Sequence, residues 1–201
     1  VPSPMHPSVP VGKDDTENVR LTLNGTPPVF DFPVKSHTEL GKDLDLMDIE
    51  RGVKLSGSRF YFLKNEGCLL ELAVLRYALD FLRERGFGIM TVPLLVKEHA
   101  MMGTGYFPGG EEQAYKMAND DLYLIGTSEV PLASYHFDEI LDSASSPIKY
   151  AAWSNCFRRE AGTYGKDTQG LYRIHQFQKV EQVYILENND EKSHEALDLL
   201  L

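Results

Sequence analysis

The sequence has little cysteine and no long apolar run. Its 201 residues include two cysteines, Cys68 and Cys156, which are too few for a disulfide framework and fit a reducing compartment. No apolar stretch approaches the roughly 20 residues that a membrane-spanning helix needs, and the proline-containing start does not resemble a signal peptide. These features argue against a disulfide-bonded secreted protein and a membrane protein, so we expect a cytoplasmic location and no membrane partner.

Basic residues are also few. Lysine and arginine number 20 against 30 aspartates and glutamates, which gives a net charge of -10. This balance argues weakly against a nucleic-acid partner, because phosphate binding requires clustered lysine and arginine. The 42% of hydrophobic and 25% of charged residues are typical of a soluble globular protein. The length suffices for one core but not for two ordinary domains, and no histidine and cysteine spacing indicates zinc.

The stretch from residue 155 to 181, NCFRREAGTYGKDTQGLYRIHQFQKVE, is expected to form a strand, a long loop and a second strand. Side chains alternate along a strand, so Arg158 and Glu160 are predicted to share a face of the first strand. The same rule places three residues on one face of the second strand, namely Phe177, Lys179 and Glu181. Charges that flank an aromatic ring suit a pocket floor, because arginine binds phosphate, a ring stacks on a base and carboxylates bind amino groups.

The loop between these strands, from Arg159 to Tyr172, is longer than most hairpin loops, and such loops are usually functional or disordered. Its glycines supply backbone freedom, and Lys166 and Arg173 supply positive charge. This composition is typical of a mobile flap over a phosphate-bearing ligand. The alternative is a solvated hairpin whose charges merely face water; the alternation in the flanking strands favours the functional interpretation.

The remaining pattern predicts an α+β fold with an antiparallel sheet flanked by helices. Strands that arrive in hairpins, rather than in strand–helix–strand repeats, argue against a doubly wound fold. Capping signals, apolar periodicity and turn residues predict helices over residues 36–41, 48–54 and 69–85 and from residue 189 onward. Strands are predicted over residues 59–63, 87–92, 115–117 and 122–125.

The predicted helix over residues 69–85 is apolar around most of its circumference, which indicates burial on more than one side. Gly86 ends this helix, and a strand then runs into Pro93. A core helix is the simplest interpretation of the pattern. Of the residues that follow, Met101 and Met102 are both expected in the core.

Thr127, Ser128 and Glu129 follow a predicted strand and precede a predicted helix. This arrangement is ambiguous. A hydroxyl can cap the helix while an acidic residue suits its first turn, or the three polar side chains can line a binding site. Both roles can coexist in one segment.

Three segments, GTSEVPL, FRREAG and RIHQFQKVE, together resemble seryl-tRNA synthetase, a class II aminoacyl-tRNA synthetase. The similarity runs from HPSVPVG near the start to YILEN near the end, so it covers nearly the whole chain. The resemblance implies the class II antiparallel sheet flanked by helices and the activity of a serine–tRNA ligase. Such an enzyme activates L-serine with ATP to seryl-adenylate and transfers the seryl group to tRNA(Ser). Mg2+ is implied as well, but its ligands are not assigned in this chain.

The resemblance also assigns roles by position. The expected serine-binding residues are Thr127, Ser128, Glu129 and Glu181. The expected ATP-binding residues are Arg158, Arg159, Glu160, Lys166 and Phe177. Among these, Arg158 would hold the α-phosphate, Glu160 would accept from the adenine amino group and Phe177 would stack on the ring. Arg173 is a candidate catalytic residue together with Arg158 and Glu160, and no residue is assigned to a metal.

Domain organisation and assembly are further expectations from the resemblance. Residues 1–18 would be a linker after the family's N-terminal helical arm, and residues 19–201 would be a catalytic domain that ends before the family's third motif. The arm carries much of the tRNA contact, which reconciles the acidic net charge with an RNA partner. Leu69–Pro93 matches the first motif, which forms a homodimer interface. Such a piece alone is expected to be weakly active or inactive.

Two other functions stay open. A synthetase-like relative that activates an amino acid for a carrier protein would lack the arm and use a zinc site, and the absence of clustered histidine and cysteine in the sequence counts against it. A catalytically silent module for dimerisation or RNA binding is the second alternative. The intact Arg158, Glu160 and Phe177 count against that module.

Overall fold

The computed structural model describes residues 5–142, 145–162 and 170–201, and the chain divides into two compact units, Val1–Lys35 and Ser36–Leu201. In the first unit, every described residue is exposed, and the regular structure of the described part is a 3-10 helix at Asp15–Glu17. Asp14 caps this helix by accepting a hydrogen bond from the Thr16 amide at 3.0 Å. The predicted boundary between residues 18 and 19 stays a prediction.

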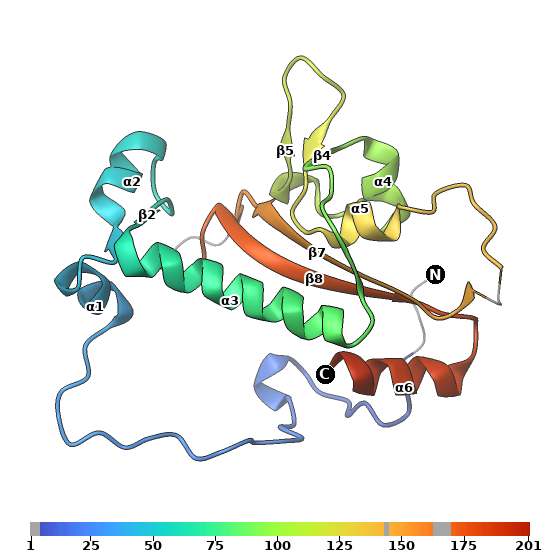
Figure 1. Ribbon diagram of the computed structural model, residues 1–201, viewed down its shortest axis with the longest axis horizontal. Helices are drawn as coiled ribbons and strands as arrows, with labels where there is room; N and C mark the ends of the chain where they lie inside the picture. The colour runs from blue at the N-terminus through green and yellow to red at the C-terminus, as the bar shows by residue number, and fades with distance from the viewer. Residues whose placement is uncertain (1–4, 143–144, 163–169) are drawn as a thin grey trace. The chain divides into compact units, whose positions relative to one another are not determined.

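The second unit contains helices and short sheets around one long antiparallel pair of strands (Figure 1). Its helices are α1 (His37–Asp43), α2 (Ile49–Ser56), α3 (Asn65–Glu84), α4 (Glu98–Gly103), α5 (Glu129–Ala133) and α6 (Asp190–Leu200), with a 3-10 helix at Glu111–Gln113. Its strands are β1 (Met47–Asp48), β2 (Phe62–Leu63), β3 (Gly88–Met90), β4 (Leu95–Val96), β5 (Tyr115–Lys116), β6 (Tyr123–Leu124), β7 (Ile148–Phe157) and β8 (Gln176–Ile185). The expected α+β class is confirmed.

Three sheets hold these strands. β7 and β8 pair antiparallel along their whole length, from Ile148 opposite Ile185 to Phe157 opposite Gln176. β3 joins the other edge of β7 in parallel, which departs from the purely antiparallel sheet that we expected. The long connection between β3 and β7 permits this, because parallel strands need a crossover of a dozen or more residues. β6 lies between β4 and β5, and β1 pairs with β2, all antiparallel.

The two faces of the β7–β8 pair have different partners. On one face, Gln178 Nε2 donates to Glu71 Oε2 of α3 at 2.7 Å, and Gln182 Nε2 donates to the Leu200 carbonyl of α6 at 2.9 Å. Figure 1 accordingly shows α3 and α6 on the same side of the two long strands. The opposite face, which we call the site face, carries Phe177, Lys179 and Glu181 and packs toward the segment that leads into α5. The alternation predicted for the second strand is therefore confirmed.

The core lies away from α3. Its buried residues come mainly from α4, α5 and the β4–β6–β5 sheet and include Val96, Ala100, Met101, Phe107, Ala114, Tyr123, Ile125 and Val130. Met101 is fully buried, as expected, whereas Met102 is 51% exposed, so its assignment to the core was wrong. Consecutive residues of a helix point in different directions, and α4 has only one face against the core.

Local sequence signals fix several of the element boundaries. The capping box between Ser36 and Glu39 opens α1, as the spacing predicted. Asp48, predicted as the first residue of the next helix, is instead the residue that caps α2 through the Arg51 amide. Asn189 caps α6 in the same way. The strand predicted over residues 59–63 is shorter in the structure, where β2 covers Phe62–Leu63. Arg59 has a φ of 65°, in the left-handed region, so the strand cannot begin at this residue.

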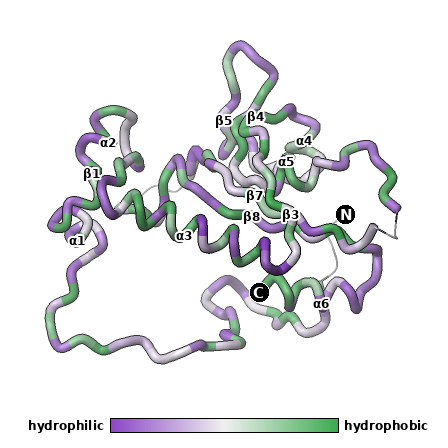
Figure 2. The backbone as a smooth tube through the Cα atoms, in the orientation of Figure 1, coloured by the Kyte–Doolittle hydropathy of each residue, from purple (hydrophilic) through white to green (hydrophobic). Residues whose placement is uncertain are grey.

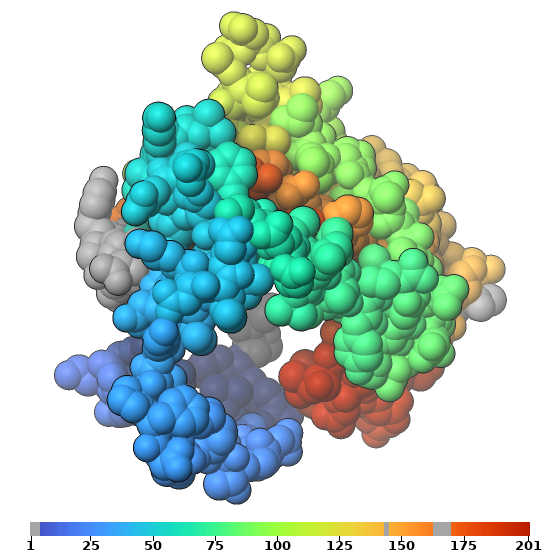
Figure 3. All heavy atoms as spheres, turned by 60° about the vertical axis from the view of Figure 1, so that its left-hand side comes forward, coloured from blue at the N-terminus to red at the C-terminus, as the bar shows by residue number. Residues whose placement is uncertain are grey.

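Helix α3 confirms the strongest helix prediction but not its burial. None of its residues is buried within this chain, and Leu69, Leu70 and Tyr77 are 64%, 63% and 71% exposed. Hydrophobic residues recur along the helix in Figure 2, and the helix lies at the surface in the space-filling view of Figure 3. Within the described ranges, no helix combines the length and the apolar character that crossing a bilayer requires.

Gly52 of α2 lies against the backbone that leads into β2. A Cβ atom at this position would lie 2.5 Å from Tyr61 Cα and 2.6 Å from the Phe60 carbonyl oxygen. Because both are backbone atoms, neither can rotate away. We therefore expect Gly52→Ala to lower the free energy of unfolding by about 1–3 kcal/mol, the usual cost of overpacking, as measured by urea denaturation.

Gly103→Ala is the matched control, because Gly103 ends α4 and has no atom within 4 Å of its Cβ position. Alanine has the higher helix propensity, so this variant should be as stable as the wild type or slightly more stable. Equal stability of the wild type and Gly52→Ala would contradict the close packing of α2 on the β2 segment.

Candidate functional site

The site face combines large functional side chains on β8 with small side chains on β7. Phe177, Lys179 and Glu181 lie opposite Cys156, Ser154 and Ala152. The three small residues are buried and rise little above the sheet. The β8 side chains therefore stand over a floor that leaves room for a ligand.

A compact cluster, which we call the Thr127 cluster, consists of Thr127, Lys179 and Glu181. Thr127 Oγ1 donates to Glu181 Oε2 at 2.7 Å and accepts from Lys179 Nζ at 2.7 Å. Lys179 and Glu181 also form an ion pair, with side chains 30% and 22% exposed. Each polar group is thus held in place by the other two, and the acidic group remains accessible from one side.

The neighbouring residues Ser128 and Glu129 differ in environment. Ser128 is fully buried, and its hydroxyl has no hydrogen-bond partner in the part of the chain that the structure describes. It stands at the N-cap position of α5 but makes no side-chain capping bond. Instead, Thr127 Oγ1 accepts from the Glu129 amide at 3.2 Å. The Glu129 side chain lies on the exposed side of α5, so the cap role predicted for this segment falls to Thr127.

Arg158 and Glu160 do not lie on the strand where alternation placed them. β7 ends at Phe157, and Glu160 has a φ of 51°, so the backbone turns through the left-handed region. The predicted common strand face was therefore wrong. The turn nevertheless brings both residues to one cavity, because it directs the Glu160 carboxylate to Arg173 Nη1, at 2.9 Å from Oε2.

That cavity, called here the Arg158 cavity, has a volume of about 390 Å3. Its lining residues are Arg158, Glu160, Leu171, Tyr172, Arg173, Ile174 and Phe177. Arg158 Nε donates to the Gly126 carbonyl at 3.1 Å, and the guanidinium carbon lies 5.2 Å from the centre of the Phe177 ring. An aromatic face, two guanidinium groups and a carboxylate thus converge on one space, as binding of an aromatic base that carries phosphate requires.

Tyr106 lies against Gly126, the residue whose carbonyl binds Arg158. A Cβ atom on Gly126 would lie 2.3 Å from the Tyr106 hydroxyl oxygen, so any larger residue at this position would displace the Tyr106 side chain. Burial raises the pKa of the Tyr106 phenol, partly offset by the charge of Arg158. The phenol is therefore protonated and neutral at physiological pH.

The two remaining ATP-binding candidates lie elsewhere. The Arg159 side chain is exposed and does not line the Arg158 cavity, although its amide donates to the Gln113 carbonyl at 2.9 Å. Lys166 falls outside the described residues, as does the loop centre from residue 163 to 169. Among the described residues, no group of three or more His, Cys, Asp or Glu side chains could hold a metal ion.

The sequence predicts some neighbours of the site but not others. Lys179 shares the period-two pattern of Phe177 and Glu181, so alternation was enough to place it on the site face. Gln113 and His37, which contact the ends of the β7–β8 connection, are far away in the chain. Only the tertiary structure brings them there.

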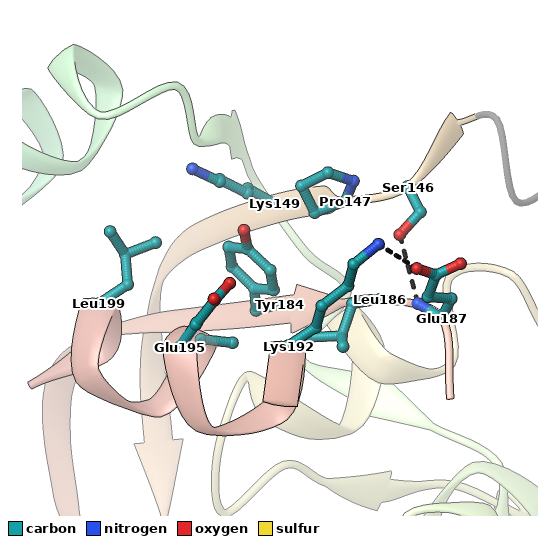
Figure 4. A pocket seen from close by; sticks show the side chains of 10 residues that line it. Ser146, Pro147, Lys149, Tyr184, Leu186, Glu187, Lys192, Glu195 and Leu199 are labelled. Carbon is teal, nitrogen blue, oxygen red and sulfur yellow. Dashed lines mark hydrogen bonds and ion pairs between the residues drawn. The ribbon is translucent and has the colours of Figure 1, made fainter. Parts of the chain in front are cut away.

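A second cavity lies on the other face of the long strands and contains none of the predicted site residues. It has a volume of about 410 Å3 and lies between the outer ends of β7 and β8 and helix α6 (Figure 4). Glu187 forms an ion pair with Lys192 here, and Lys149 lies over the Tyr184 ring. Because its charges are balanced in this way, this cavity is a weaker candidate than the Arg158 cavity.

Comparison with known proteins gives one consistent result. A family model described as the tRNA synthetase class II core domain (G, H, P, S and T) matches residues 114–199. The serine–tRNA ligase of Nocardia farcinica is 54% identical over 192 residues, which are 95% of this chain and 46% of that protein. The serine–tRNA ligase of Treponema denticola is 46% identical over 202 residues, 100% of this chain and 48% of that protein.

Solved structures agree with these relatives. The seryl-tRNA synthetase of Pyrococcus horikoshii, complexed with ATP, has a TM-score of 0.84 and 43% identity over 88% of this chain and 44% of its own. The cytoplasmic serine–tRNA ligase of Naegleria fowleri, in complex with AMP, has a TM-score of 0.91 and 33% identity over 96% of this chain and 46% of its own. The chain thus spans about half the length of the relatives that it matches.

Proposed function

This chain matches seryl-tRNA synthetases in sequence and in class II fold over about half of their length, and we propose that the protein that carries it is a serine–tRNA ligase. The observation that supports this proposal best is the arrangement of the site face. The Arg158 cavity and the Thr127 cluster adjoin one another along β8, through Phe177, Lys179 and Glu181. One subsite suits a nucleotide and the other suits a small molecule with an ammonium and a hydroxyl group.

In the first step, a carboxylate oxygen of L-serine attacks the α-phosphorus of ATP. An oxygen–phosphorus bond forms, the bond to the bridging oxygen breaks, and pyrophosphate leaves with the electron pair. Phosphoryl transfer of this kind depends on positioning and charge neutralisation. Arg158 is the proposed ligand of the α-phosphate, because Gly126 fixes its guanidinium beside Phe177.

The same cavity provides for the base. Phe177 is the proposed stacking partner of adenine, and Glu160 the proposed acceptor for its amino group. Arg173 orients Glu160 through their ion pair and can neutralise phosphate charge from the same position. Arg159 and Lys166 are proposed as further ATP-binding residues of the connecting loop.

Serine is proposed to bind at the Thr127 cluster, with Ser128 and Glu129 beside it. The Glu181 carboxylate would accept from the ammonium and the hydroxyl of the substrate. A site that binds a hydroxyl in this way rejects alanine, because it leaves a buried polar group unpaired. Lys179 and Thr127 hold the carboxylate in position through their hydrogen bonds.

In the second step, the seryl group passes to the terminal ribose hydroxyl of tRNA(Ser), and AMP leaves. Mg2+ is proposed to accompany ATP, but no step is assigned to it. A cytoplasmic location fits both the composition and the name of the Naegleria fowleri relative. Residues 1–18 as a linker and 19–201 as the catalytic domain belong to the same proposal.

Arg158→Ala tests the assignment of the phosphate ligand. In the protein that carries this chain, kcat/KM for serine-dependent ATP–pyrophosphate exchange should fall by an amount equivalent to roughly 2–4 kcal/mol, as for other preorganised charge stabilisers. Arg51→Ala is the control, because the Arg51 side chain on α2 is 80% exposed and pairs with Asp48, the N-cap residue of that helix. Exchange by Arg158→Ala within a few fold of the wild type would refute the assignment.

Glu181→Gln tests the assignment of the serine subsite. The neutral amide binds an ammonium weakly and offers donors where acceptors are needed. The KM for serine should therefore rise by more than about tenfold, equivalent to about 1.4 kcal/mol, whereas the KM for ATP should change far less. Equal losses for both substrates would mean that the two subsites are not separate.

We further propose a homodimer through Leu69–Pro93, supported by the apolar exposed side of α3. Leu69→Glu combined with Tyr77→Glu should shift the protein from dimer to monomer at micromolar concentration in sedimentation velocity. Leu55→Glu, at a 74% exposed position of α2, should leave the dimer intact. A wild-type monomer at this concentration would contradict the proposal.

A further inference from the structure

We propose that Gln113 and His37 are positioning residues that hold the two ends of the β7–β8 connection. In this role they keep Glu160 and Arg173 opposed across the Arg158 cavity. The inference rests on the proposed function for the identity of the ligand, ATP, and on the geometry alone for the contacts. Neither residue lines the cavity, so each acts through the backbone that it holds.

Gln113 binds the first end of the connection, directly after β7, through its backbone carbonyl and its side-chain amide. Its carbonyl accepts from the Arg159 amide at 2.9 Å. Its side-chain amide then accepts from the Ala161 amide at 3.2 Å through Oε1 and donates to the Ala161 carbonyl at 3.0 Å through Nε2. These three bonds fix the residues on both sides of Glu160, the residue that carries the left-handed φ of 51°.

The turn at Glu160 is unfavourable for a residue with a side chain, because Cβ crowds the following carbonyl. Such a conformation persists only where its surroundings specify it. Gln113 supplies that specification. Without it, the segment after β7 would relax toward extended backbone, and the Glu160 carboxylate would turn away from Arg173.

His37, the first residue of α1, binds the second end. Its Nε2 accepts from the Leu171 amide at 3.1 Å, and its ring packs edge-on against Tyr172, with the ring centres 4.8 Å apart. The approach is so close that a Cβ atom on Gly170 would lie 1.8 Å from Nε2, and Gly170 has a φ of 76°. Only glycine fits at this point, directly before the residues that line the cavity.

The His37 contact affects the Arg158 cavity through the position of Arg173. Leu171, Tyr172 and Arg173 follow the anchored glycine and line the Arg158 cavity. Arg59 Nη1 supports the same segment by donating to the Arg173 carbonyl at 3.2 Å. The ion pair of Arg173 with Glu160 therefore joins an end held by Gln113 to an end held by His37.

Two variants of Gln113 with side chains of similar size remove one or both of its side-chain contacts. Gln113→Glu keeps an acceptor for the Ala161 amide but replaces the donor with an oxygen that faces the Ala161 carbonyl, and Gln113→Met removes both contacts. In the protein that carries this chain, both should raise the KM for ATP in pyrophosphate exchange by about tenfold, equivalent to about 1.4 kcal/mol, and leave the KM for serine within about twofold. Gln182→Glu is the control, because Gln182 loses a similar bond, to the Leu200 carbonyl, on the other face of the sheet.

His37 allows a second, independent comparison. His37→Gln retains an acceptor for the Leu171 amide, whereas His37→Phe retains only the ring contact with Tyr172. The KM for ATP should rise in His37→Phe and be largely rescued in His37→Gln. A ring-packing role alone would give the reverse order and would overturn the proposal for this end.

Amide hydrogen exchange tests the anchors without activity. The Ala161 amide should exchange faster in Gln113→Met, and the Leu171 amide faster in His37→Phe, with other amides of the second unit unchanged. Faster amide hydrogen exchange with an unaltered KM for ATP would overturn the positioning role. An equal rise in the KM for ATP and for serine, together with a lowered unfolding midpoint, would also overturn it. Unaltered amide hydrogen exchange in both variants would refute the two anchoring contacts. If the wild-type protein shows no serine-dependent ATP–pyrophosphate exchange, the proposed function fails instead.

Discussion

The register between β7 and β8 is the constraint on which the site depends. Because side chains alternate along a strand, a slip of one residue would turn Lys179 and Glu181 toward α3 and bring Gln178 to the site face. Both faces oppose such a slip. Gln178 bonds with Glu71 of α3 and with Trp153 on β7, while Lys179 and Glu181 bond with Thr127 on the other side. The long antiparallel pair therefore acts as a rigid support from which both subsites are built.

The end of β7 contributes differently, because function there requires the strand to stop. A continued strand would point Arg158 and Glu160 in one direction and leave Arg173 without its carboxylate. The left-handed turn at Glu160 costs on the order of 1–2 kcal/mol. It lets Glu160, which follows β7, meet Arg173, which precedes β8, across one cavity. Strain of this kind is common at binding sites, where the surrounding structure specifies it.

Sequence patterns predicted what is local. Capping signals placed the starts of α1 and α6, and period-two alternation placed Phe177, Lys179 and Glu181 on one face. Alternation failed at Glu160, because no local signal marks a non-glycine residue that will adopt a positive φ. The parallel pairing of β3 with β7 and the anchors at His37 and Gln113 escaped prediction for a related reason. They join segments far apart in the chain, and a single sequence without tertiary structure does not specify which distant segments meet.

The acidic composition shows how a property of the whole chain can mislead about one site. A net charge of -10 argues against phosphate ligands only if charge is spread evenly, and interactions beyond about 10 Å are largely screened at ordinary salt. From Arg158 to Glu181, the described cations Arg158, Arg159, Arg173 and Lys179 accompany two described acidic side chains, Glu160 and Glu181. Each of these carboxylates is paired with one of the cations. Arg158 is instead held by a backbone carbonyl and an aromatic ring, neither of which neutralises it. The local field at the cavity is therefore positive although the chain is acidic, and a phosphate group that enters it responds to the nearer charges.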